Sequence, residues 1–244
     1  MSERITKAVL LAAGRGTRMR ELTNDLPKPM IEVRGKPVLQ HIIEGLSQAG
    51  VRDFLLIVGY RAEVVRQQFG NGRTLGVQIG YATQVLQDGT GKVVELARDF
   101  AGAAPFILSY GDILVDPTNY SRLTNLGTET EAIIAVKRNE DVSQGGAVFL
   151  NDRLELIDLR EKPKPGEPTS PWYNAGIYAF RPSIFGFTAR LERSPRGEFE
   201  LTDAVRALAH SGHKVQALEL TGEWADVRDP EVLAALNQGR SSTR

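Results

Sequence analysis

Residues 10–30 read LLAAGRGTRMRELTNDLPKPM, passing from an apolar run through glycine and arginine to a lysine between two prolines. The apolar run 8–13 is short and continuous, which is typical of a strand covered on both faces of its sheet. Glycines directly after a strand allow a tight turn whose exposed N–H groups can bind phosphates. From the spacing of Gly14 and Gly16 alone, a phosphate-binding loop and an ordinary strand-to-helix turn are equally open.

Two well-known glycine loops do not fit the chain. A dinucleotide-binding fingerprint needs a third glycine, and Met19 occupies that position. A Walker loop needs Gly-Lys followed by serine or threonine, whereas Gly91-Lys92 is followed by Val93. The loop after residue 13 therefore belongs to neither class.

Positive charge on the same stretch favours the phosphate-binding interpretation. Arg15 and Arg18 follow the glycines, and Lys28 stands between Pro27 and Pro29. Proline fixes its own φ and biases the preceding residue to extended geometry, so Lys28 is held on a stiff segment. Cations held in this way suit a polyphosphate whose negative charge shifts during a reaction. The alternative is an ordinary solvated loop.

The pattern of apolar residues predicts an α/β fold. Strands expected at 8–13, 54–58, 77–82 and 106–109 alternate with helices expected at 38–49, 62–69 and 91–100. This alternation indicates a Rossmann-like, mixed but mostly parallel sheet flanked by helices. After about residue 130 the pattern changes to a small α+β extension. There we expect strands at 132–136, 172–180 and 214–220, a hairpin at 147–159, and helices at 201–208 and 231–237.

Composition excludes several classes of function. Lysine plus arginine number 30 and aspartate plus glutamate number 30, so the basic excess of a nucleic-acid or membrane-surface binder is missing. The chain has no cysteine, which excludes disulfides and cysteine-ligated zinc. No apolar stretch reaches the roughly 18 residues of a membrane span. We expect a cytoplasmic protein without nucleic-acid or membrane partners, and a homo-oligomer is left open.

The motif at 11–19, taken with Leu26-Pro27-Lys28-Pro29, resembles the signature of sugar-1-phosphate nucleotidyltransferases. This family includes glucose-1-phosphate thymidylyl- and uridylyltransferases and the uridylyltransferase domain for N-acetylglucosamine 1-phosphate. Further matches follow in order at 81–84, 89–91, 110–112, 145–148, 161–163, 174–177 and 224–227. The resemblance covers residues 5–236. It implies the nucleotide-diphospho-sugar transferase fold in a single domain 1–244, with a nucleotide-binding half to about residue 130 and a sugar-phosphate-binding half at 131–240.

The resemblance implies a magnesium-dependent reaction in which an NTP and a sugar 1-phosphate give an NDP-sugar and pyrophosphate. It assigns nucleotide binding to Leu11, Ala12, Ala13, Gly14, Arg15, Gly16, Thr17, Gln84, Gly89 and Thr90. It assigns catalysis to Arg18, Lys28, Asp112 and Lys162, sugar binding to Gly146, Glu161, Lys162 and Asn174, and the metal to Asp112 and Asp226. A side-chain amide such as that of Gln84 offers both a donor and an acceptor, which suits uracil or thymine and favours UTP or dTTP.

The chain also departs from the family pattern. Arg228-Asp229 stands where many members have Gly-Thr, and Lys92-Val93 replaces a more usual small or His-Ala pair. Three alternatives to this reaction stay open: a catalytically silent subunit that binds an NDP-sugar, a guanylyl- or cytidylyltransferase of the same family, and a glycosyltransferase. The last usually shows Asp-x-Asp after the strand, whereas Asp112 is followed by Ile113-Leu114.

Overall fold

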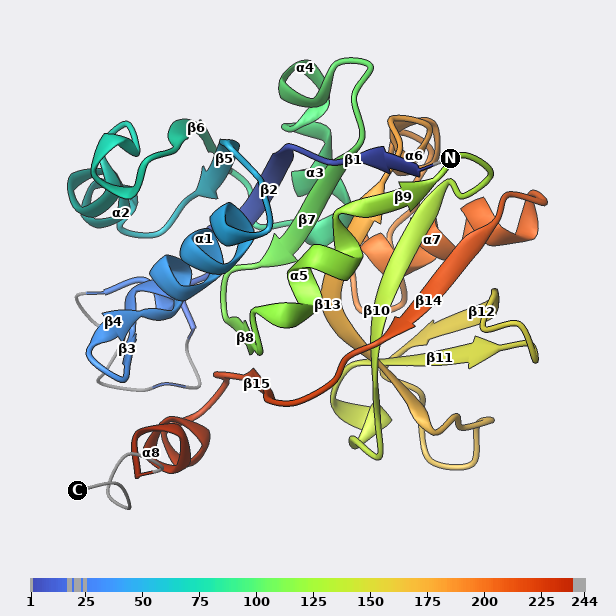
Figure 1. Ribbon diagram of the computed structural model, residues 1–244. Coiled ribbons are helices and arrows are strands. Elements are labelled where there is room, and N and C mark those ends of the chain that lie inside the picture. The colour runs from blue at the N-terminus through green and yellow to red at the C-terminus, as the bar shows by residue number, and fades with distance from the viewer. Residues whose placement is uncertain (1, 17–18, 20–22, 24–25, 239–244) are drawn as a thin grey trace.

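A computed structural model describes residues 2–16, 19, 23 and 26–238. Its centre is a nine-stranded sheet, shown with its helices in Figure 1. Four neighbouring strands of this sheet are parallel: β6 (Gln78–Thr83), β5 (Asp53–Val58), β2 (Lys7–Ala12) and β7 (Phe106–Tyr110). They are the strands that the first half of the sequence predicts, and they confirm the α/β fold class.

The second half of the chain extends the same sheet with mostly antiparallel strands. Strand β13 (Trp172–Phe180) pairs antiparallel with β7 and carries both β10 (Ala132–Arg138) and β11 (Gly146–Leu150). Strand β14 (Val215–Glu219) pairs parallel with β10, and β12 (Leu156–Glu161) forms a hairpin with β11. The predicted α+β extension is therefore continuous with the parallel strands.

Helices cover both faces of the sheet. Along β2, Ala8, Leu10 and Ala12 point into one core and Val9 into the other, as the two-residue period of a strand requires. The first core includes α1 (Val38–Gln48), α2 (Ala62–Phe69) and α5 (Thr118–Leu123). The second includes α3 (Thr90–Glu95), α4 (Arg98–Ala101), α6 (Ile184–Thr188) and α7 (Leu201–His210).

Short elements at the sheet margins complete the fold. They are β1 (Ser2–Arg4) with β9 (Asn125–Gly127), β3 (Glu32–Val33) with β4 (Lys36–Pro37), β8 (Ile113–Val115) with β15 (Trp224–Asp226), and the 3-10 helices η2 (Lys28–Met30), η3 (Arg73–Leu75) and η4 (Val142–Gln144). None of these pairs is predicted from the sequence. The β8–β15 pair joins two segments far apart in the chain.

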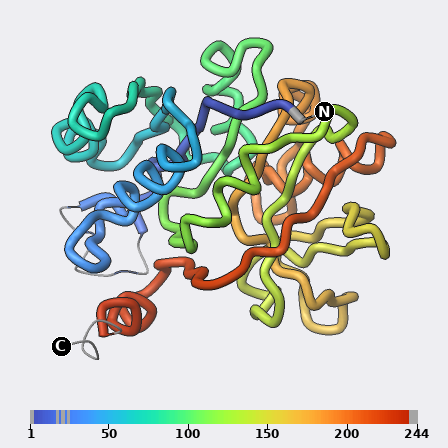
Figure 2. Tube along the Cα trace, viewed as in Figure 1, coloured from blue at the N-terminus to red at the C-terminus, as the bar shows by residue number. Residues whose placement is uncertain are grey.

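The last helix, α8 (Pro230–Gln238), lies beside the β3–β4 hairpin, as Figure 2 shows in red and blue. The Asp229 carboxylate accepts from the Val232 amide at 2.9 Å and so caps the N-terminus of the helix. The Asn237 side-chain oxygen accepts from the Arg34 amide at 2.7 Å, and Leu233 packs against the first core. The end of the described chain is thus held against the β3–β4 hairpin.

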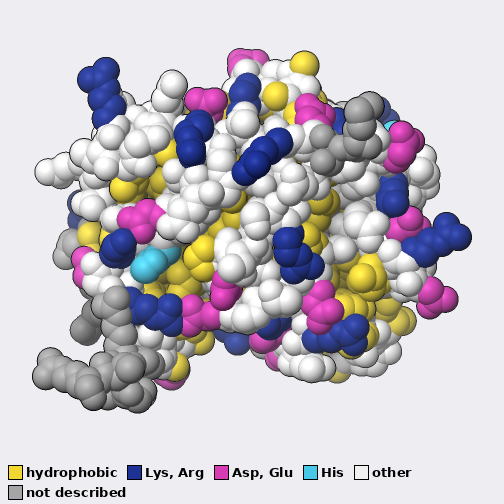
Figure 3. All heavy atoms as spheres, viewed as in Figure 1, with side chains coloured by type: hydrophobic (Ala, Val, Ile, Leu, Met, Phe, Trp, Pro, Cys, Tyr) yellow, Lys and Arg dark blue, Asp and Glu magenta, His cyan; other side chains and the backbone are white. Residues whose placement is uncertain are grey.

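The surface carries mixed charge. On the face shown in Figure 3, basic and acidic side chains are interspersed, in keeping with the balanced composition. Among the described residues, no helix combines the length and the apolar character that a membrane span requires.

Candidate active site

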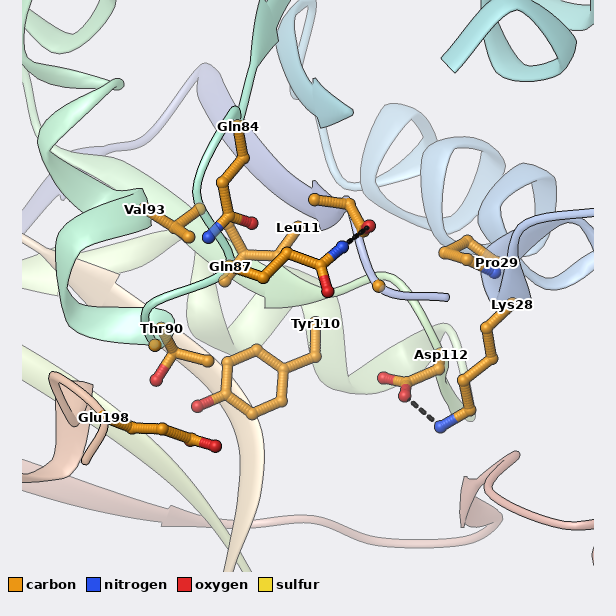
Figure 4. A pocket seen from close by; sticks show the side chains of 13 residues that line it. Leu11, Lys28, Pro29, Gln84, Gln87, Thr90, Val93, Tyr110, Asp112 and Glu198 are labelled. Atoms are coloured by element: carbon orange, nitrogen blue, oxygen red, sulfur yellow. Dashed lines mark hydrogen bonds and ion pairs between the residues drawn. The ribbon is translucent and has the colours of Figure 1, made fainter. Parts of the chain in front are cut away.

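The carboxyl ends of the parallel strands border a cleft of about 370 Å³. Ligands of open α/β sheets bind at this edge, because loops that leave neighbouring strands there surround a common space. The cleft is lined by Leu11, Ala13, Gly14, Lys28, Pro29, Gln84, Gln87, Gly89, Thr90, Val93, Tyr110, Asp112 and Glu198. Figure 4 shows their side chains converging from β2, β7, η2 and the loop after β6.

Most residues predicted to bind the nucleotide line this cleft, and three described ones do not. The Ala12 side chain is buried in the first core, and Arg15 is exposed with its guanidinium 5.1 Å from the centre of the Tyr60 ring. Gly16 packs against the stem of Lys28. Thr17 and Arg18 lie outside the described residues, so their predicted roles stay predictions.

Lys28 joins the two predicted metal ligands. Its ammonium donates to the Asp112 carboxylate and lies 3.3 Å from Asp226 Oδ1. Pro27 is extended, with φ −69° and ψ 148°, but Lys28 begins the 3-10 helix η2, so the extended geometry expected of Lys28 from the following Pro29 is wrong. The first turn of η2 places the lysine instead. The side chain of Lys28 is only 11 % exposed. Three charges therefore meet in a partly buried position.

The β8–β15 pair brings Asp226 to Asp112. Asp226 lies opposite Ile113 in this ladder, and the Val227 amide donates to the Asp112 carbonyl at 3.0 Å. Asp112 itself lies two residues after the end of β7 and directly before β8. Backbone hydrogen bonds thus fix the two carboxylates relative to one another.

The electrostatics of this trio suit a cation. Burial raises the pKa of Asp226, and the neighbouring Asp112 carboxylate raises it further. Burial alone would lower the pKa of Lys28, but the two carboxylates outweigh it and the pKa is raised. Convergent carboxylate oxygens are ligands that a hard divalent cation prefers, and such a cation relieves the repulsion between them. The two residues therefore fit a magnesium ion.

Gly16 supports Lys28 by having no side chain. Its φ is +71°, and a Cβ there would lie 2.6 Å from Lys28 Cβ. We expect Gly16→Ala to lower the free energy of unfolding by about 2 kcal/mol, since it adds backbone strain and displaces Lys28. Urea denaturation measures the change. Gly14→Ala is the matched control, because a Cβ on Gly14 meets nothing within 4 Å; equal stability of the two variants would contradict the assignment.

A second cavity of about 250 Å³ adjoins the first. All residues predicted to bind the sugar line it, namely Gly146, Glu161, Lys162 and Asn174. Lys28, Thr90, Tyr110, Asp112 and Glu198 border both cavities. The two spaces therefore share a wall, and that wall contains the lysine and a carboxylate of the charged trio.

Local backbone and side-chain bonds position the residues of the second cavity. Lys162 has a positive φ of 44°, and its amide donates to the Gly145 carbonyl at 2.6 Å. The side-chain Nδ2 of Asn174 donates to the Tyr178 hydroxyl at 2.6 Å, and its Oδ1 accepts from the backbone amide of Gly176 at 3.3 Å. Burial raises the pKa of Glu161, and Glu200 adds to the shift. Arg196 Nη1 lies 3.5 Å from Glu161 Oε1.

Several lining residues are missed by the sequence argument, among them Arg196, Glu198 and Glu200 on the loop 192–200. This loop lies against the segment after β6, because the Phe199 amide donates to the Asp88 carbonyl and the Gly91 amide to the Phe199 carbonyl, each at 2.8 Å. Gly89 permits this approach, since a Cβ there would lie 2.4 Å from the Phe199 oxygen. Glu198 thereby reaches both cavities. No pattern in the sequence signals this contact.

The departures from the family pattern leave the two cavities open. Arg228 lines neither cavity, and its Nε lies 3.5 Å from Asp229 Oδ2. The Lys92 ammonium lies 5.0 Å from the centre of the Phe199 ring, outside the first cleft, while Val93 lines it.

Comparison with known proteins identifies the family of the chain. The sequence profile of the family described as nucleotidyl transferase matches residues 7–241. The chain belongs to this family. A family relative from Methanococcus maripaludis, named bifunctional protein GlmU, is 37 % identical over 231 residues, which are 94 % of this chain and 53 % of the relative. One from Haloferax volcanii, named UTP–glucose-1-phosphate uridylyltransferase AglF, is 34 % identical over 92 % of each chain.

Solved structures show the same fold. A UDP-glucose pyrophosphorylase complexed with UDP-glucose superposes with a TM-score of 0.89 at 22 % identity, covering 98 % of this chain and all of the other. A putative glucose-1-phosphate thymidylyltransferase from Bacillus anthracis gives 0.83 at 25 % identity, covering 98 % and 96 %. The chain spans about half the length of several curated relatives it matches.

Proposed function

We propose that the protein transfers a nucleotidyl group from an NTP to a sugar 1-phosphate, giving an NDP-sugar and pyrophosphate. The observation that carries the proposal is the wall shared by the two cavities. A nucleotide in the first cleft and a sugar phosphate in the second would meet beside Lys28 and Asp112. The activities named for the family relatives support the same reaction class.

In this proposal the chain acts by positioning and by stabilising charge. The sugar phosphate is already a nucleophile near neutral pH, so no general base is required. Lys28 would contact the α-phosphate and the incoming phosphate oxygen, and Lys162 would hold the sugar phosphate. Arg18 would stabilise the departing pyrophosphate. Glu161, Asn174 and Gly146 would contact the sugar.

Asp112 and Asp226 would hold magnesium. The ion would neutralise charge on the α-phosphate when it is bound. The two carboxylates would hold the positive charge of the ion beside Lys28. The β8–β15 pairing supports this role because it fixes Asp112 and Asp226 relative to each other.

The nucleoside would occupy the part of the first cleft between Leu11 and Gln84. The backbone N–H of Gln84 donates to the Val58 carbonyl at 2.8 Å. The side-chain amide is free of this bond and faces the cleft in Figure 4. Its donor and acceptor match the edge of uracil or thymine, so UTP or dTTP is the proposed substrate. The division into nucleotide-binding and sugar-phosphate-binding halves near residue 130, and a cytoplasmic location, belong to the same proposal.

A grid of nucleoside triphosphates against sugar 1-phosphates, scored by pyrophosphate release with magnesium, tests the reaction. Release with at least one pair, accompanied by formation of the NDP-sugar, is the expected result. Calorimetric binding of an NDP-sugar without pyrophosphate release from any pair would instead identify a silent binding subunit.

Glu161 should make the affinity for the sugar phosphate pH-dependent. An ionised carboxylate is a stronger acceptor for sugar hydroxyls than the protonated acid, and the raised pKa of Glu161 means that acidification protonates it earlier than an exposed glutamate. We expect the KM for the sugar 1-phosphate to rise as pH falls, and Glu161→Gln to raise that KM about tenfold at neutral pH. The KM for the NTP serves as the internal control.

The sugar phosphate also gains a proton as the pH falls, with a second pKa of about 6. The contribution of Glu161 is therefore the difference between the pH profiles of wild type and Glu161→Gln. Parallel profiles would show that Glu161 does not contact the sugar.

A further inference from the structure

Gln87 is a second glutamine in the first cleft, and the family signature does not include it. It lies on the same loop as Gln84, between β6 and α3. The loop is fixed at both ends, because the Gln84 amide donates to the Val58 carbonyl and the Asp88 carbonyl accepts from the Phe199 amide, each at 2.8 Å. Gln87 is therefore presented to the cleft by a held segment.

A hydrogen bond fixes the orientation of the Gln87 side chain. Its Nε2 donates to the Ala13 carbonyl at 3.2 Å, across the cleft at the end of β2. A carbonyl oxygen only accepts, so the amide nitrogen must face Ala13 and the amide oxygen must face away. Figure 4 shows this oxygen turned toward the space that Tyr110 and Asp112 border.

The Gln87 oxygen is thus an acceptor held inside the cleft. The Ala13 carbonyl also accepts from the Tyr60 amide at 3.2 Å, so both of its acceptor positions are used and it cannot itself serve a ligand well. Within the described part of the chain, no hydrogen-bond donor contacts the Gln87 oxygen. The cleft therefore offers one fixed acceptor close to where the sheet edge meets the glycine loop.

The chemistry of an NTP decides what this acceptor can meet. Triphosphate oxygens are negatively charged acceptors at neutral pH, so an amide oxygen beside them gains no hydrogen bond. The nucleoside does carry donors, namely the N3–H of uracil or thymine and the hydroxyls of the ribose. We propose that Gln87 reads the nucleoside by accepting a hydrogen bond from one of these N–H or O–H groups, in an orientation set by Ala13. The inference rests on the proposed function.

Equilibrium binding in the absence of a sugar phosphate tests the proposal without turnover. The probes are UTP and its 2′-deoxy, 3′-deoxy and 3-methyl analogues, each of which lacks one donor. We expect wild-type protein to bind one analogue about tenfold more weakly than UTP, as for one lost hydrogen bond. The analogue affected identifies the donor as a ribose hydroxyl or the base N–H. This comparison needs no variant, so misfolding cannot obscure it.

The variant Gln87→Met then distinguishes a hydrogen bond between Gln87 and the nucleoside from a purely structural role of Gln87 in its loop. If Gln87 reads the nucleoside, the tenfold ratio falls to within about twofold in the variant. A variant that binds UTP and all analogues equally more weakly, with the ratio kept, would overturn the proposal, and so would a wild type that does not discriminate among them. Gln68→Met, the same change on the exposed surface of α2, is the matched control. Failure of the wild type to bind any NTP or release pyrophosphate would refute the proposed function as well.

Discussion

Replacing Asp112 by asparagine should lower turnover about a thousandfold, equivalent to about 4 kcal/mol of activation free energy. The asparagine keeps the size of the side chain but removes the charge that Lys28 contacts and that a divalent cation requires. The fold should survive, because the contact to the Val227 amide uses the backbone carbonyl of residue 112. Pyrophosphate release at saturating substrates and magnesium measures the effect.

Asp116→Asn supplies the matched control for this experiment. Asp116 accepts from the Thr118 amide and hydroxyl at the start of α5 and lines neither cavity. An asparagine oxygen can still accept both bonds, so turnover should stay near that of the wild type. Wild-type turnover in Asp112→Asn at saturating magnesium would show that Asp112 is not a metal ligand.

Replacing Lys28 by methionine should destabilise the metal-free protein by about 2 kcal/mol at neutral pH. Methionine keeps the aliphatic stem that packs against Gly16 but leaves Asp112 and Asp226 facing each other without a counter-charge. The pKa of Asp226 is already raised, and it should rise further without the ammonium. Lowering the pH through that pKa protonates the carboxylate and removes the repulsion, so the loss should become smaller as the pH falls below neutral.

Urea denaturation of both proteins, with and without magnesium, measures this loss. Magnesium should restore much of the stability of Lys28→Met, since a divalent cation supplies the missing positive charge. Lys36→Met is the control, because Lys36 forms an exposed ion pair with Glu44 at 2.8 Å and such pairs contribute about 0–1 kcal/mol. A loss that is independent of pH and magnesium would mean that Lys28 acts only through packing.

The sequence predicts the fold well because buried strands and amphipathic helices leave a periodic signal. The periodic signal gives wrong helix bounds where the apolar residues keep their helical spacing although the backbone leaves the helix. The helix expected at 91–100 is divided into α3 and α4, yet Val94, Ala97 and Ala101 stay on one buried face across the break. Helix α5 and the β8–β15 pair are missed because they are short and depend on tertiary contacts.

The candidate site is predicted unevenly for a similar reason. The segment that holds Lys28 is local, so a cation between two prolines is visible in the sequence alone, whereas the 3-10 helix that contains it is not. The meeting of Asp112 and Asp226 follows only from the family resemblance, since their contact depends on a strand pair. Gln87 and Glu198 are missed because their places in the cleft depend on how separate loops lie against each other, which no local pattern encodes.

The strand pair β8–β15 also has a consequence for biosynthesis. Lys28 and Asp226 are separated by 198 positions in the chain. A ribosome delivers the chain from its N-terminus, so β2, β5, β6 and β7 can assemble while Asp226 is still being made. The part of the nucleotide cleft that these strands border can therefore form before Glu198 and Phe199 are made, and the carboxylate pair is completed only when nearly all of the described sheet is already available. The order of synthesis therefore means that Lys28, Asp112 and Asp226 come together only after most residues around them have been made.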